Sequence, residues 1–270
     1  MSGIHHLILG GSQSKSTITV PGSVSVVDDG TYVTYTFPAT APMVISNGTP
    51  TLNVSLVLVS GGQGGGGAFK TTGGVGGQGG NVTYQSTRTL IPGSYTVTIG
   101  SGGAGAAPLE TGAVGGLSQF TRNSPSPAVI DTAPAPSGQT ARQGGAPTSF
   151  NGTPPSPINP SRTAGGSGGA GVPTPFGTFG GGGGDGGYAA VPAPTSRRGP
   201  GPGGPGGPGG GGPGGPGSYP SNSGNTGNPG APNTGGAGGG GGATPGSVGS
   251  GGLGGPGVMK IRFLKSDIRL

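Results

Sequence analysis

The sequence has no cysteine and no tryptophan, and only 7% of its 270 residues are charged. Without cysteine, neither a disulfide framework nor a thiolate metal site can form. No apolar run approaches the ~20 residues of a membrane-spanning helix. The first residues, MSGIHHLILGGS, also lack a basic region followed by an apolar run and a cleavage site. We therefore expect no membrane-spanning helix and no secretory signal peptide.

Side chains of any size are scarce too, because 73 residues are glycine, 30 are proline and only 28% are hydrophobic. Residues 199–217 contain nothing but glycine and proline, and Pro202, Pro205 and Pro208 recur at every third position. Three residues make one turn of the polyproline II helix, whose backbone N–H and C=O groups point outward. Glycine allows such strands to approach and to hydrogen-bond backbone to backbone. The tract therefore predicts a polyglycine II-like body.

Two other structures suit a segment rich in glycine and proline, namely a collagen triple helix and a disordered linker. A collagen run would be short here, because Pro213 occupies a position at which the repeat requires glycine. A linker needs no aromatic side chains, whereas this region carries several that could pin loops onto an ordered body. These aromatics, which we take as candidate receptor-facing loop residues, are Phe150, Phe176, Phe179, Tyr188 and Tyr219.

Apolar residues are concentrated before residue 100 and after residue 257, where they alternate with polar ones. A period of two is typical of strands that bury one face. It occurs in residues 17–27, where Pro21-Gly22 predicts a turn between two short strands, and again in residues 31–37, 52–59, 94–99 and 258–264. Apolar residues at helical spacing are missing, so we expect almost no helix.

The last of these strands, residues 258–264, can pair only with strands far upstream, so the two ends of the chain must meet. We therefore expect a mainly β fold with two parts. A small antiparallel base, similar to a β-sandwich or jelly roll, is formed by residues 1–100 and 253–270. A long glycine-rich, polyglycine II-like body with loops is formed by residues 101–252.

The net charge of +6 is uneven, because the last eleven residues contribute +3 of it through Lys260, Arg262, Lys265 and Arg269 against Asp267. Such a basic strand suits either an anionic partner or a solvated sheet edge that lysine protects from aggregation. The repeated aromatic stacking pattern of nucleic-acid binders is missing. We favour the protected edge and expect no specific nucleic-acid partner.

Signals of catalysis are weak. His5 and His6 are adjacent, so in a strand their side chains point to opposite faces and do not jointly bind a metal, although a symmetric oligomer could cluster copies of them. The acidic residues form no catalytic pair, and Asp28-Asp29 is typical of a turn. Asp185 stands alone in a glycine run, where we favour a role in capping backbone amides over contact with a ligand. We expect no enzymatic activity, no metal and no organic cofactor.

The order of the segments resembles a known family. The strings LNVSLVLVSGGQGGGG (residues 52–67), PGSYTVTIGSGGAG (92–105), FGTFGGGGG (176–184) and GVMKIRFL (257–264) are similar, in this order, to the glycine-rich domain of tailed-phage virion proteins. The resemblance implies an adhesive or structural role in the virion, as in tail-fibre or tail-tip proteins whose loops contact a host receptor. The start of the chain differs from detachable phage adhesins, since it has no tryptophan-rich attachment region.

The leading interpretation is a non-enzymatic phage virion protein, a tail-fibre or tail-tip adhesin. It would form homo-oligomers, bind other virion proteins and contact a bacterial surface glycan or outer-membrane protein. A capsid decoration protein, or another purely structural virion component, is the alternative. An ice-binding or matrix protein fits less well, because the threonines are irregularly spaced.

Overall fold

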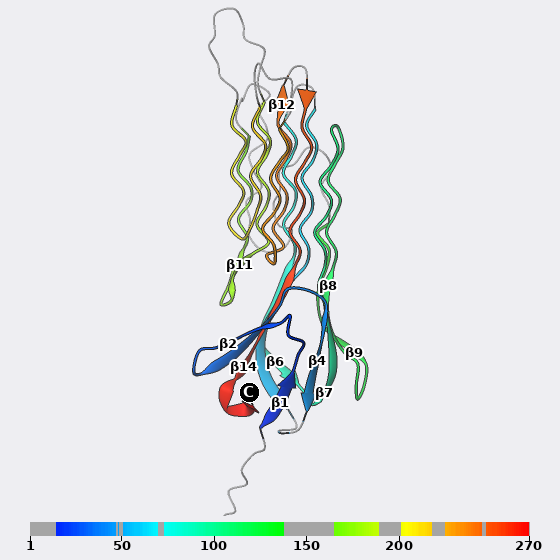
Figure 1. The fold of residues 1–270 in the computed structure, drawn as a ribbon, viewed down its shortest axis with the longest axis vertical. Coiled ribbons are helices and arrows are strands. Elements are labelled where there is room, and N and C mark those ends of the chain that lie inside the picture. Colours follow the sequence, from blue (N-terminus) through cyan, green and yellow to red (C-terminus); the bar gives the residue numbers. More distant parts are fainter. Residues whose placement is uncertain are drawn as a thin grey trace, which may run out of the picture.

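The structure, a computed structural model, describes residues 15–46, 48, 51–69, 73–137, 165–188, 201–217, 225–244 and 247–269. It is elongated, with β-sheets at one end and a bundle of extended segments along the long axis (Figure 1). We call the sheets the β base (residues 15–59, 82–99, 118–133 and 258–269). The bundle is the glycine body (residues 60–69, 73–81, 100–117, 165–188, 201–217, 225–244 and 247–257).

The β base contains two sheets. The six-stranded sheet has the order β15 (Ile268–Arg269), β1 (Ser16–Thr19), β4 (Ala41–Ser46), β7 (Gly93–Thr98), β8 (Ser118–Arg122) and β9 (Ala128–Ala133). The five-stranded sheet has the order β2 (Ser25–Asp28), β3 (Tyr32–Phe37), β14 (Val258–Leu264), β5 (Leu52–Val59) and β6 (Val82–Leu90). All pairs are antiparallel except β1 with β15.

Regular structure outside the two sheets is sparse. Two small hairpins lie in the glycine body, one formed by β10 (Val172–Thr174) with β11 (Gly177–Phe179) and the other by β12 (Ala243–Thr244) with β13 (Ser247–Val248). The described residues contain no α-helix, and their one helical element is a 3-10 turn, η1 (Lys265–Asp267). The expectation of a mainly β fold with almost no helix is confirmed.

The two sheets pack face to face around a core made by alternate residues of each strand. From the five-stranded sheet, β3 supplies Tyr35 and Phe37 and β14 supplies Ile261. From the six-stranded sheet, β4 supplies Met43 and β8 supplies Phe120. All five side chains are almost fully buried, which matches the period of two in the sequence.

The predicted meeting of the chain ends is confirmed by β14. It lies between β3 and β5, with Ile261 opposite both Tyr35 and Leu56. Lys260 and Arg262 therefore lie on a central strand, and the favoured interpretation of the basic residues as edge protection is wrong for these two. Arg269 does lie on an edge strand, β15 of the six-stranded sheet. The Pro21-Gly22 turn also does not make a hairpin, because β1 and β2 belong to different sheets.

The glycine body is held by backbone hydrogen bonds that repeat every third residue. Successive N–H groups of one segment donate to three neighbours in turn: Gly61 and Gly64 to residues 113–116, Gly62 and Gly65 to residues 252–255, and Gln63 and Gly66 to residues 75–78. Residues 103–109 and 238–241 donate to carbonyl groups of the same segment. Neighbours in several directions with a three-residue repeat are the arrangement of polyglycine II. Among the described residues, neither a collagen helix nor a disordered linker fits this network.

The strands of the β base continue directly into the glycine body. Thus β5 runs into residues 60–69, and residues 111–117 run into β8. At the junction the Ser118 hydroxyl donates to the Val59 carbonyl at 2.7 Å and accepts from the Gly100 amide at 2.9 Å. Extended strands and polyproline II have similar backbone angles, so a segment can pass from sheet to bundle without a break.

This continuity moves the boundaries that the sequence predicted. Residues 60–69 and 73–81 belong to the glycine body although they precede residue 100. Conversely, β8 and β9 belong to the β base although they lie within residues 101–252. Amino-acid composition placed the boundary between the two parts near residue 100. In the structure, the boundary instead depends on which segments pair with each other.

The glycine–proline tract forms a hairpin rather than the single strand that we expected. Gly209 and Gly210, with φ angles of 94° and 96°, reverse the chain between residues 201–207 and 211–217. The two arms are antiparallel, since Gly214 donates to the Gly204 carbonyl at 2.9 Å. Glycines line the inside of both arms, and the prolines at every third position are exposed: Pro202, Pro205, Pro208, Pro213 and Pro216.

Candidate functional site

Several described segments of the glycine body end at the side opposite the β base. Their ends pair through backbone hydrogen bonds, since Glu110 accepts from Gly67, Gly187 accepts from Ala243, and Gly201 accepts from Gly217. Figure 1 places β12 at this end, far from β1. We call it the distal end, and define it by the described residues there: Phe69, Gly73, Pro108, Leu109, Glu110, Thr111, Tyr188, Gly201, Gly217, Asn225, Thr244 and Ser247.

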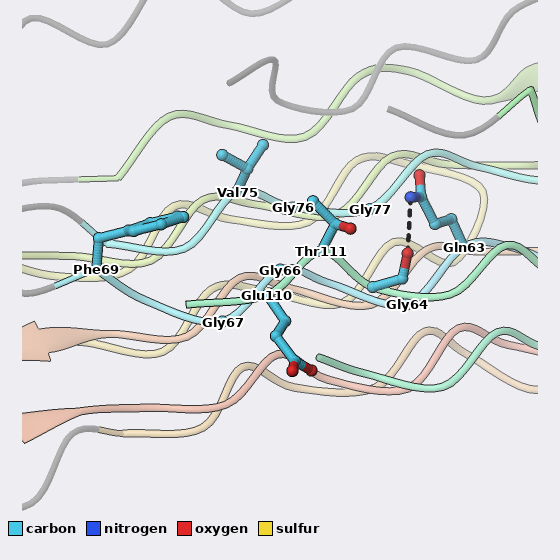
Figure 2. A pocket seen from close by; sticks show the side chains of 11 residues that line it. Gln63, Gly64, Gly66, Gly67, Phe69, Val75, Gly76, Gly77, Glu110 and Thr111 are labelled. Carbon is cyan, nitrogen blue, oxygen red and sulfur yellow. Dashed lines mark hydrogen bonds between the residues drawn. The ribbon is translucent and has the colours of Figure 1, made fainter. Parts of the chain in front are cut away.

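A shallow groove lies on the flank of the glycine body beside the distal end. Figure 2 shows its lining, in which glycines form the floor and the Phe69 ring and the Val75 side chain rise from it. The Gln63 amide closes one end by donating to the Gly112 carbonyl at 3.0 Å. Glu110 also lines the groove, but its exposed carboxylate points away from the side on which Phe69 and Val75 rise (Figure 2). A flat backbone floor beside an aromatic ring can bind a small ligand with an apolar face.

Phe176 and Phe179 hold a hairpin against the β base. The hairpin of β10 and β11 packs on the outer face of the five-stranded sheet, where Phe179 contacts Val57 and Val258. The Arg262 guanidinium lies 4.9 Å from the Phe176 ring centre, and the Lys260 ammonium lies 5.5 Å from that of Phe179. Phe179 is only 4% exposed, so in this chain it faces the sheet and not a receptor. We call these contacts the hairpin latch.

We expect Phe179→Ala to open the hairpin latch and to lower the free energy of unfolding by about 3 kcal/mol, as for other buried phenylalanines. Faster amide hydrogen exchange in residues 172–179 would report the opening. Thr178→Ala is the matched control, because Thr178 lies on the same hairpin and is exposed. Unchanged exchange in Phe179→Ala would show that the latch does not hold the hairpin.

Of the other residues that we predicted to lie in receptor-facing loops, only Tyr188 is among the described residues. Tyr188 lies at the distal end, where it forms a parallel bridge with Ala243 and is partly buried. Phe150 and Tyr219 lie outside the described residues, as do His5 and His6. The groove residues Phe69 and Thr111 were not singled out from the sequence, because a lone aromatic or hydroxyl residue beside glycine runs carries no distinctive pattern.

Asp185 is the acidic residue that the structure buries inside the glycine body. Its Oδ1 atom accepts a hydrogen bond from the Gly76 amide at 2.9 Å, which agrees with the predicted amide-capping role. Its Oδ2 atom is buried without a hydrogen-bond partner. Burial raises the pKa of Asp185 to about 6, against the lowering effect of the Gly76 and Gly166 backbone groups.

The described part of the chain offers few other kinds of site. No group of three or more histidine, cysteine, aspartate or glutamate side chains is placed to hold a metal ion there. No described helix is long and apolar enough to cross a membrane. The candidate site is therefore the distal end with its neighbouring groove.

Comparison with known proteins identifies the kind of domain. No curated protein matches the sequence significantly. The profile of one family, described as the glycine-rich domain, matches residues 26–264, which takes in strands of the β base from both chain ends and the whole glycine body. This chain therefore belongs to the glycine-rich domain family.

Proposed function

We propose that the protein is a non-enzymatic virion protein that docks onto other virion proteins through the β base and presents the distal end to a host surface receptor. The observation that supports this is the polarity of the molecule. Ser16 of β1 pairs with Ile268 of β15, so the first and the last described segments both lie in the β base. The distal end, with β12, lies at the opposite end of the molecule (Figure 1).

A body of this construction suits recognition of a variable surface. Its order resides in backbone hydrogen bonds, so loop sequences at the distal end can change without altering packed side chains. Loops attached to a rigid support lose less entropy on binding than free ones. The exposed Glu110 carboxylate, the Phe69 ring and the Thr111 hydroxyl are the described side chains best placed to contact a bacterial glycan or outer-membrane protein.

The similarity of the segment order to tailed-phage virion proteins supports the tail-fibre or tail-tip assignment. Capsid decoration is the alternative, and it places the protein at a different position in the virion. Labelled antibody against the chain should bind intact particles at the tail. Labelling at a position repeated over the capsid would instead favour decoration.

The adhesive role predicts that side chains of the distal end carry binding. We expect simultaneous replacement of Phe69, Glu110 and Thr111 by alanine to reduce binding to host cells more than tenfold, with the melting temperature little changed. Val129→Ser is the matched control, because Val129 is 57% exposed on the edge strand β9 of the β base. Undiminished cell binding by the replaced variant would contradict the proposal.

A further inference from the structure

We propose that Asp185 makes the glycine body a proton-binding element, so that the body tightens when the solution becomes mildly acidic. The Asp185 side chain is deeply buried, with only 3% of its surface exposed. An ionised carboxylate in such a place has lost its water and needs donors in return. Oδ1 accepts a hydrogen bond from the Gly76 amide, and the Gly166 backbone also favours the charged form, but Oδ2 has no hydrogen-bond partner.

The surrounding backbone suits the neutral acid better than the carboxylate. Along the facing segment, the Gly74 amide donates to Gly241 and the Gly77 amide donates to Gly238, so neither amide is free to donate to Asp185. A backbone carbonyl has two lone pairs and can accept a second hydrogen bond. The buried Oδ2 atom, which has no donor, can therefore gain a partner by carrying the proton itself. A protonated carboxyl can donate to a carbonyl, while an ionised one stays unpaired.

No counter-charge compensates within the described residues. Segment 180–187 exchanges backbone hydrogen bonds with residues 73–80, 165–171, 201–217 and 234–243. These segments contain no aspartate, glutamate, histidine, lysine or arginine. Desolvation therefore acts on Asp185 without an attractive charge, and this is the physical cause of its pKa of about 6.

The sign of the effect follows from linkage. The folded-state pKa lies above the ordinary 3.8, so between these two values the folded protein binds more protons than the unfolded chain. The contribution of protonated Asp185 to the free energy of unfolding is fully present below about pH 3.8. This contribution is lost as the pH rises through about 6. Asp28 and Asp29 in the β base act oppositely, because hydrogen bonds to Lys265 and to the Tyr32 amide, respectively, lower their pKa values.

The test compares wild type with Asp185→Asn, in which the amide imitates the neutral acid and all other carboxyl groups are retained. Urea unfolding is measured at pH 4 and pH 7. Relative to the variant, we expect the wild-type unfolding equilibrium constant to rise about 50-fold between these values, from a pKa change of 3.8 to about 6. Glu110→Gln, an exposed carboxyl of the same body, should leave the pH dependence unchanged.

A direct titration of the wild-type protein does not require the variant to fold. The side-chain carboxyl carbon of Asp185 in the wild-type protein, followed by NMR, should titrate with a midpoint well above its ordinary value. A midpoint near 3.8, or wild-type and Asp185→Asn curves that run parallel from pH 4 to pH 7, would overturn the proposal. Neither result depends on the receptor-binding role proposed above.

Discussion

Gly65→Ala is expected to lower the free energy of unfolding by about 3 kcal/mol or more, at the upper end of overpacking penalties. Gly65 lies in the inner segment of the glycine body, which bonds to neighbours in several directions. A Cβ atom there would stand 2.0 Å from the Gly239 carbonyl oxygen. That oxygen is part of a backbone whose own amide donates to Asn228 at 2.8 Å, so it cannot rotate away as a side chain would.

Two control variants isolate this packing effect. One replaces a glycine that has no close neighbours, and the other replaces an exposed residue of the glycine body. Gly22→Ala should be neutral or slightly stabilising, because nothing lies within 4 Å of its added Cβ and alanine restricts the unfolded chain. Pro205→Ala should be mild, since Pro205 is exposed on the outer face of the body. Thermal melting of the purified variants measures all three. A Gly65→Ala variant that melts like Gly22→Ala would show that these backbones are not in contact.

Truncation after Gly257 is expected to abolish cooperative folding of the β base. The deletion removes β14, the middle strand of the five-stranded sheet, and leaves β3 and β5 without their shared partner. It also removes Met259, Ile261 and Phe263, all almost fully buried. Burial of each such side chain contributes about 1.5–3 kcal/mol, so their combined loss is comparable with the whole stability of a typical domain.

The matched control is truncation after Leu264. It removes η1 and β15, and β15 pairs only with β1, through two residue pairs. This shorter deletion should weaken the protein but leave it folded. Circular dichroism and NMR dispersion distinguish the two variants, and a peptide of residues 258–264 added to the first should restore the sheet by strand addition. A folded protein lacking β14 would contradict its central place in the base.

Some features of the candidate functional residues could be predicted from the sequence, and others could not. Asp185 stood out as a lone acid, and its bond to the Gly76 amide agrees with the capping role predicted for it. That its second oxygen lacks a partner could not be predicted, because this depends on segments distant in sequence. Phe179 was expected to face a receptor, yet it packs on the outer face of β5 and β14. Aromatic content predicts that a side chain will be covered, but not which surface covers it.

The sequence by itself determined the conformation of the individual segments. Alternating apolar residues specified strands such as β3 and β14, and prolines at every third position specified the polyproline II arms around Pro205. These are local properties, which follow from side-chain periodicity and from the fixed φ of proline.

Only the tertiary structure decided which segments lie together. It placed residues 60–69 in the body, brought β8 and β9 into the base and turned the chain at Gly209. Glycine has no side chain with which to mark a register or a partner, so neighbouring glycine runs are equivalent in sequence. Their partners are chosen by backbone hydrogen bonds between distant residues, and by how closely one backbone can approach another.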